Sequence, residues 1–163
     1  MMQLRSPITP SLWFDGNAEE AANFYVSLFS DSRIVRTIRW QAGGPYPEGT
    51  ALAVDFELGG RPFNALNGGA AFPFDEAISF IAEVSDQAEL DALWEALLAG
   101  GGVEGQCGWL KDRFGLSWQV VPRQMTEWMT SDDTEAVARI TQVMLTMVKL
   151  DIAPLQAAFE GRS

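Results

Sequence analysis

The sequence predicts an α+β fold in which paired βαβββ modules form one curved mixed sheet around a cup, with helices at the C-terminal end. The first observation is an internal repeat: the pattern Ala-Glu-x-x-Ala-x-aromatic at residues 18–24 returns at residues 88–94, each time after a strand-like segment. Self-similarity of this kind is typical of duplicated structural units. The second observation is that the order of predicted strands and helices repeats with the pattern, and the third is that this order stops at Pro122.

The first module is predicted over residues 8–67. Residues 8–14 form a short apolar strand that ends at Asp15, which precedes a helix and is predicted to be its N-cap. Residues 18–29 place apolar side chains at three- and four-residue steps, which indicates a helix with one buried face. Three further strands are predicted, at residues 32–40, 50–58 and 61–66, and the last two meet at the tight Gly59-Gly60 junction.

The second module is predicted over residues 76–122. Asp86 is the expected N-cap of its helix, which carries an apolar stripe from Leu90 to Leu98 and stops at the glycines 100–102. The predicted strands are residues 77–84, 104–110 and 116–121. One strand of this module is therefore shortened or lost relative to the first.

Residues 123–163 are predicted to be a helical C-terminal extension of a single domain that spans residues 1–163. One helix follows the capping residues 131–134 and carries apolar side chains from Val137 to Val148, and a short last helix begins at Pro154. The methionine-rich stripe of the longer helix could form a partner surface, but packing on the chain's own core or across a homodimer is the more ordinary interpretation.

Composition excludes several classes of function. The net charge of −11 and the pI near 4.3 disfavour binding to nucleic acid or to anionic membranes. The single cysteine, Cys107, rules out an internal disulfide and suits a reducing compartment. We therefore expect a cytoplasmic protein without a signal peptide or a spanning helix.

Three motifs carry a resemblance to a known family. They are LWFDGNAEEA at residues 12–21, ALNGG at residues 65–69 and GWLKDRFGLSWQVVP at residues 108–122. Together they resemble the PhnB-like branch of the glyoxalase, bleomycin-resistance and dioxygenase superfamily, which has the vicinal oxygen chelate fold. The resemblance implies a homodimer, and proteins of this branch often carry a demethylubiquinone methyltransferase label.

The resemblance also implies where a metal would be held. The superfamily typically places ligands drawn from His, Glu and Gln on the first and last strands of each module. These positions correspond here to Gln119, Asn64, Ser79 and one of residues 8–10. Because the chain contains no histidine and these groups are feeble ligands, we expect no metal and no other cofactor at the usual site, although a divalent ion could still bind there weakly. Glu83 lies on the same strand face as Ser79 and is the candidate catalytic carboxylate.

The candidate ligand-binding residues also include two tryptophans, Trp13 and Trp109, and the thiol Cys107. Trp13 and Trp109 are predicted near the site, where they could stack on a flat ligand, whereas Trp118 must point away from Gln119 and is predicted to pack behind the sheet. Cys107 is a further candidate, although a packed core thiol is the more ordinary interpretation, since no histidine could activate it.

The leading functional hypothesis is a small-molecule-binding protein that orients its ligand through Asn64, Ser79 and Gln119. An enzyme is the alternative, either a metal-dependent lyase or isomerase of glyoxalase type or a methyltransferase. A methyltransferase would need S-adenosylmethionine, and no strand, glycine-rich turn and helix follow one another in the order typical of nucleotide-like cofactor sites. A structural subunit, with its cup filled by side chains, is the third possibility.

Overall fold

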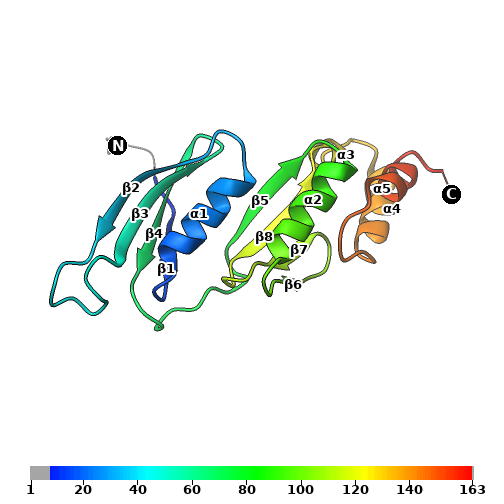
Figure 1. Ribbon diagram of the computed structural model, residues 1–163. Helices are drawn as coiled ribbons and strands as arrows, with labels where there is room; N and C mark the ends of the chain where they lie inside the picture. The colour runs from blue at the N-terminus through cyan, green and yellow to red at the C-terminus, as the bar shows by residue number, and fades with distance from the viewer. Residues whose placement is uncertain (1–7, 163) are drawn as a thin grey trace, which may run out of the picture. The chain divides into compact units, whose positions relative to one another are not determined.

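The computed structural model describes residues 8–162, and the chain divides into two compact units, the first ending at Pro73 and the second beginning at Phe74 (Figure 1). Each unit contains one βαβββ module, and the second also carries the C-terminal helices. The predicted pair of modules is thus confirmed. Among residues 8–162, no helix combines the length and apolarity needed to cross a lipid bilayer.

The first unit folds as a four-stranded sheet covered by one helix (Figure 1). Its elements are β1 (Ser11–Phe14), α1 (Ala18–Leu28), β2 (Arg33–Arg39), β3 (Ala51–Leu58) and β4 (Arg61–Asn67). The strand order is β1-β4-β3-β2, with β1 parallel to β4 and the other neighbours antiparallel. The first and last strands of the module therefore lie side by side.

The core of this unit lies between α1 and one face of the sheet. Strand side chains alternate between the two faces, so every second residue points toward the helix. The buried residues are Leu12, Phe14, Val54, Phe56 and Ala65 from the strands and Ala18, Ala21, Ala22 and Tyr25 from α1. The small alanines let the helix approach closely. The opposite face of the sheet, which we call the open face, carries the remaining side chains of each strand.

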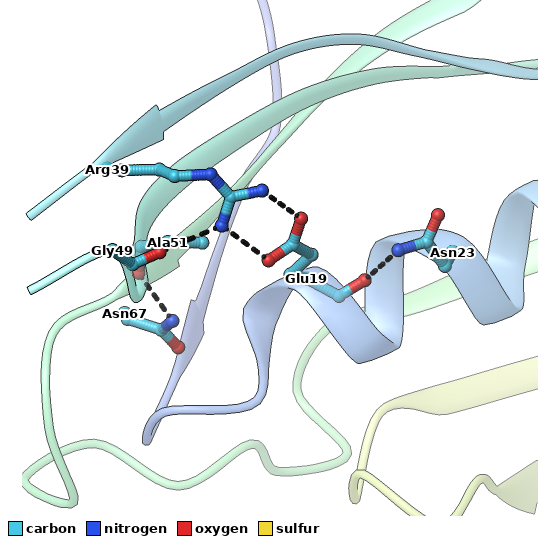
Figure 2. A network of polar contacts seen from close by, with 6 residues as sticks. All are labelled: Glu19, Asn23, Arg39, Gly49, Ala51 and Asn67. Atoms are coloured by element: carbon cyan, nitrogen blue, oxygen red, sulfur yellow. Dashed lines mark hydrogen bonds and ion pairs between the residues drawn. The ribbon is translucent and has the colours of Figure 1, made fainter. Parts of the chain in front are cut away.

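The N-terminal end of α1 is held by a residue distant in sequence. Asn67, at the end of β4 and 2% exposed, accepts a hydrogen bond from the Ala18 amide at 3.0 Å and donates one to the Ala51 carbonyl at 2.8 Å. An ion pair of 2.7 Å between Arg39 and Glu19 joins the same helix to β2 (Figure 2). The hydrogen bond from Arg39 is the main reason that the pKa of Glu19 is lowered.

The predicted N-cap role of Asp15 is wrong. The N-cap position belongs to Asn17, whose side chain makes no capping hydrogen bond. Asp15 instead accepts a hydrogen bond of 3.0 Å from the Tyr46 hydroxyl, in the loop between β2 and β3. Partial burial raises the pKa of Tyr46, and the hydrogen bond to Asp15 raises it further.

The second unit repeats the topology of the first (Figure 1). Its module consists of β5 (Ser79–Val84), α2 (Gln87–Leu98), β6 (Val103–Glu104), β7 (Trp109–Lys111) and β8 (Ser117–Pro122). The strand order is β5-β8-β7-β6, with β5 parallel to β8. Asp86 caps α2 as predicted, since its Oδ1 accepts a hydrogen bond of 2.9 Å from the Glu89 amide.

The predicted strand at residues 104–110 is wrong, because a loop divides it into β6 and β7. Within this loop Cys107 and Gly108 have φ angles of 59° and 81°. Such left-handed conformations cannot continue a strand. The shortened strand expected in this module is β6, which has two residues.

The C-terminal extension contains α3 (Gln124–Met129), α4 (Thr134–Met144) and α5 (Ile152–Phe159). The sequence did not predict α3, and α5 begins two residues before the predicted Pro154. Helix α4 ends before Met147 and Val148, which the prediction had included. The carbonyls of Met147 and Val148 instead accept hydrogen bonds of 2.8 and 2.7 Å from the amides of Cys107 and Gly108. The segment after α4 therefore binds the loop that precedes β7.

Candidate functional site

A serine and an amide side chain form a hydrogen-bonded pair on the open face of each sheet. In the first module, Ser11 Oγ on β1 donates to Asn64 Oδ1 on β4 at 2.9 Å. In the second, Gln119 Nε2 on β8 donates to Ser79 Oγ on β5 at 2.8 Å. Each pair joins the first strand of its module to the last, because these strands are parallel neighbours. We call them the Ser–amide pairs.

The structure thus pairs the side chain of Asn64 with Ser11, whereas the Asn64 backbone amide donates to the carbonyl of Pro10, one of the three expected residues, at 2.9 Å. Ser11 stands directly opposite Asn64 in the ladder between β1 and β4. The expected position missed it by one residue, because Ser11 lies three residues before the end of β1 whereas Ser79 lies five residues before the end of β5. The alternation of β1 could have identified it, since Ser11 and Trp13 share the face opposite to the buried Leu12 and Phe14.

In the first module the pair extends into a polar row across all four strands. Asn64 Nδ2 donates to Asp55 Oδ1 at 2.8 Å, and Arg36 donates to Asp55 Oδ2 from Nε at 3.1 Å and from its terminal nitrogen at 2.5 Å. The hydrogen bond from Asn64 lowers the pKa of Asp55 by more than partial burial raises it, and Arg36 lowers it further. We call Ser11, Asn64, Asp55 and Arg36 the polar row.

Asp55 and Arg36 were not predicted as site residues, although the sequence contains a signal for Asp55. It lies as far before the Gly59-Gly60 turn as Asn64 lies after it, so a tight hairpin places the two residues opposite each other. Arg36 could not be found in this way, because a register shift interrupts the ladder between Ile34 and Arg36.

Trp13 lies on the open face of the first sheet, two residues from Ser11. Its indole N–H donates to the Gly69 carbonyl at 2.7 Å, and its ring meets Phe72 edge-on at a centroid distance of 5.1 Å. The ring lies so close to Gly68 that a Cβ at that position would overlap it. The indole nitrogen is therefore engaged within the protein, and the half-buried ring is the part of Trp13 that remains for a ligand.

Trp109 lies opposite Gln119 in the ladder between β7 and β8, on the open face of the second sheet. It occupies the position, relative to Gln119, that Asp55 occupies relative to Asn64. Trp118 points to the helix side, where it is buried and 3% exposed, as predicted.

A small cavity of about 150 Å³ opens beside Trp109. Its lining includes Val103, Ser117 and the ion pair of 2.5 Å between Lys111 and Glu76. The hydrogen bond from Lys111 lowers the pKa of Glu76. The cavity is thus bounded by an indole, an aliphatic side chain, a neutralised pair of charges and Glu104, whose carboxylate accepts a hydrogen bond of 3.0 Å from the Trp94 indole.

The two remaining candidate residues are Glu83 and Cys107. Glu83 is exposed on the face of β5 that carries Ser79, and its carboxylate accepts a hydrogen bond of 3.4 Å from Thr126 of α3. Cys107 is half-buried in the loop before β7 rather than on a strand. Neither residue makes a hydrogen bond to Gln119 or Ser79 in the part of the chain that the structure describes.

The donors at the implied metal positions do not fit a transition-metal site. They are hydroxyl and amide groups, whereas zinc, iron and nickel prefer imidazole, thiolate or carboxylate. Asn64 is moreover engaged with both Ser11 and Asp55. Across residues 8–162, the structure contains no group of three or more His, Cys, Asp or Glu side chains arranged to hold a metal ion.

Two βαβββ modules, each with its first and last strands paired in parallel, give the chain the vicinal oxygen chelate fold. Residues 6–121 match the family described as 3-demethylubiquinone-9 3-methyltransferase. The chain belongs to this family, known as the PhnB family.

Solved structures agree with this assignment. The chain is 35% identical to the PhnB protein of Bacillus cereus, with 72% of this chain and 99% of that chain covered and a TM-score of 0.66. A Pseudomonas aeruginosa protein is 25% identical, with 71% and 96% covered and a TM-score of 0.56. The fosfomycin resistance protein FosX of Mesorhizobium loti, at 15% identity, shares the fold over 84% of this chain and 100% of its own, with a TM-score of 0.51. A search of curated proteins gave no match.

Proposed function

We propose that this protein binds small organic molecules at the Ser–amide pair on the open face of each sheet, without a metal ion at those positions. The observation that carries the proposal is the repetition of the pair. In both modules an amide on the last strand is hydrogen-bonded to a serine on the first strand. These are the positions at which the superfamily typically holds a metal, and here they offer hydrogen-bond donors and acceptors instead.

The surroundings of the second pair favour a flat, neutral ligand. Ligand sites combine apolar walls with a few polar groups that fix orientation. Gln119 is flanked by the indole of Trp109 and by the exposed aliphatic side chain of Ile81, which is 63% exposed. The nearby Lys111 charge is compensated by Glu76. An aromatic or conjugated molecule with a carbonyl or hydroxyl group suits these neighbours.

Replacing Gln119 by leucine is expected to weaken ligand binding about tenfold. The change preserves bulk but removes the amide, and with it one or two hydrogen bonds to the ligand. A library of small neutral aromatic compounds can be screened by the NMR shifts of the Gln119 side-chain amide and the Trp109 indole N–H, and the best binder titrated against both proteins. The matched control is Gln41→Leu, an exposed loop residue of the first unit whose amide contacts the Arg39 carbonyl. Equal weakening by both variants would contradict the proposal.

The rival proposal is an enzyme that uses a metal ion, Glu83 or S-adenosylmethionine. We expect protein purified without a chelator to carry well below one equivalent of zinc, nickel, iron or manganese, because the donors are poor. Elemental analysis measures this directly. Stoichiometric metal that is lost in Gln119→Leu, or calorimetric binding of S-adenosylmethionine, would favour the enzyme.

We further infer a single-domain protein that acts as a homodimer in the cytoplasm. The implied homodimer of the family and the low cysteine content support this. Sedimentation equilibrium tests the dimer, with a monomer at micromolar concentration as the contrary outcome.

A further inference from the structure

The two Ser–amide pairs differ in what surrounds the amide. Asn64 stands opposite Asp55, a carboxylate, whereas Gln119 stands opposite Trp109, an indole. An amide side chain can donate from its nitrogen and accept at its oxygen, so its neighbours decide which way it points. The difference between Asp55 and Trp109 therefore affects what each pair can offer to a ligand.

The orientation of Asn64 is fixed by Asp55. An ionised carboxylate can only accept hydrogen bonds, so the atom of Asn64 that faces Asp55 at 2.8 Å must be the nitrogen. Arg36, which donates two hydrogen bonds to the same carboxylate, keeps it charged. The carbonyl oxygen of Asn64 must then face Ser11.

This orientation determines the state of the Ser11 hydroxyl. Because its neighbour is the Asn64 oxygen at 2.9 Å, Ser11 has to donate its only proton there. What remains on the exposed Ser11 is an oxygen that accepts no side-chain hydrogen bond from residues 8–162. Gln119 has no carboxylate opposite it, so the second pair is not fixed in this way.

We propose that the first module recognises a hydrogen-bond donor of the ligand, a neutral hydroxyl or N–H group, at Ser11 Oγ, and that Asp55 is the positioning residue that imposes this preference. The inference rests on the proposed function, since it names the ligand chemistry of one of its two binding positions. Asp55 acts through Asn64 and does not itself need to touch the ligand.

Benzyl alcohol and benzyl methyl ether form a suitable pair of probes, because they share a neutral ring and differ in the hydroxyl donor. Their affinities are measured by NMR titration of the Ser11 backbone amide and the Asn64 side-chain amide. The wild-type protein is expected to bind the alcohol about fivefold more tightly, the ratio given by one hydrogen bond of ordinary strength. In Asp55→Asn the preference is expected to disappear. Arg36 can only donate, so the oxygen of the new amide stays toward Arg36 and its nitrogen faces Asn64, which must then turn its own oxygen toward residue 55 and its nitrogen toward Ser11. Ser11 then accepts from Asn64 and can donate its proton to the oxygen of either probe.

Glu57→Gln is the matched control. Glu57 lies on the same strand and the same face and pairs with Arg33 at 2.9 Å, as Asp55 pairs with Arg36, but it does not contact Asn64. This variant removes the same charge and is expected to retain the fivefold preference. Equal binding of both probes by the wild-type protein, or a preference that survives in Asp55→Asn, would overturn the inference while leaving the proposed function intact. Failure of both probes to shift any signal at either Ser–amide pair would instead overturn the proposed function, and the inference with it.

Discussion

Replacing Asp112 by alanine is expected to lower the free energy of unfolding by about 3–5 kcal/mol, because three N–H donors lose a charged acceptor in a buried environment. Asp112 follows β7 and is 3% exposed. Its Oδ1 accepts hydrogen bonds of 2.8 and 3.1 Å from the Phe114 and Leu116 amides, and its Oδ2 accepts one of 2.9 Å from the Trp118 indole. Urea denaturation followed by circular dichroism measures the change.

Two further variants make this prediction specific. In Asp112→Asn the amide oxygen can still serve the two backbone amides, but its nitrogen then faces the Trp118 N–H, so about half of the loss is expected. Asp132→Ala, at an exposed position before α4, is the control and is expected to change stability by less than about 0.5 kcal/mol. A loss below about 1 kcal/mol for Asp112→Ala would show that water can replace the carboxylate.

Asp112 also shows why a turn is harder to interpret from sequence than a strand. The strand that ends the second module was predicted almost to the residue, because the alternation of residues 116–121 is a local signal. The burial of Asp112 depends on Trp118 of the next strand approaching it. That approach arises only when the two strands pair.

A contact between residues far apart in the sequence also explains why the predicted strand at residues 104–110 is wrong. The break between β6 and β7 requires Cys107 in a left-handed conformation, which its residue type does not suggest. Its amide is held by the carbonyl of Met147, forty residues further along the chain. Helix α4 correspondingly ends before Met147, although the apolar pattern of its sequence continues.

The candidate site follows the same rule. The family resemblance placed Asn64 and Gln119 on the last strand of each module, where the structure has them. Arg36 could not be predicted, because its place depends on a register shift in the ladder between β2 and β3. Ser11 was missed, although the alternation of β1 puts it on the same face as Trp13. What each amide can do chemically is decided by the residue opposite it, Asp55 or Trp109, and this is a property of the paired strands.

The two modules hold the N-termini of their helices differently: Asp86 caps α2 from the position next to the helix, whereas α1 is held by Asn67 of β4, which is distant in sequence. The second large expected effect concerns Asn67. Replacing Asn67 by alanine is expected to lower the free energy of unfolding by about 3 kcal/mol, because the buried Ala18 amide and Ala51 carbonyl both lose their partner. Asn67→Asp is not expected to restore stability, since a carboxylate can accept from Ala18 but cannot donate to Ala51.

Asn23→Ala is the matched control for this prediction, because Asn23 is exposed and donates within its own helix, to the Glu19 carbonyl at 2.8 Å (Figure 2). Alanine favours a helix more than asparagine does, so stability is expected to stay within about 0.5 kcal/mol or to rise slightly. Hydrogen exchange at the Ala18 amide provides a local measurement, and it should accelerate in Asn67→Ala but not in Asn23→Ala. If the two variants behaved alike, α1 would be held by its alanine-lined packing alone. The two modules would then differ in how their helices are stabilised, because a side chain, Asp86, still caps the helix of the second module.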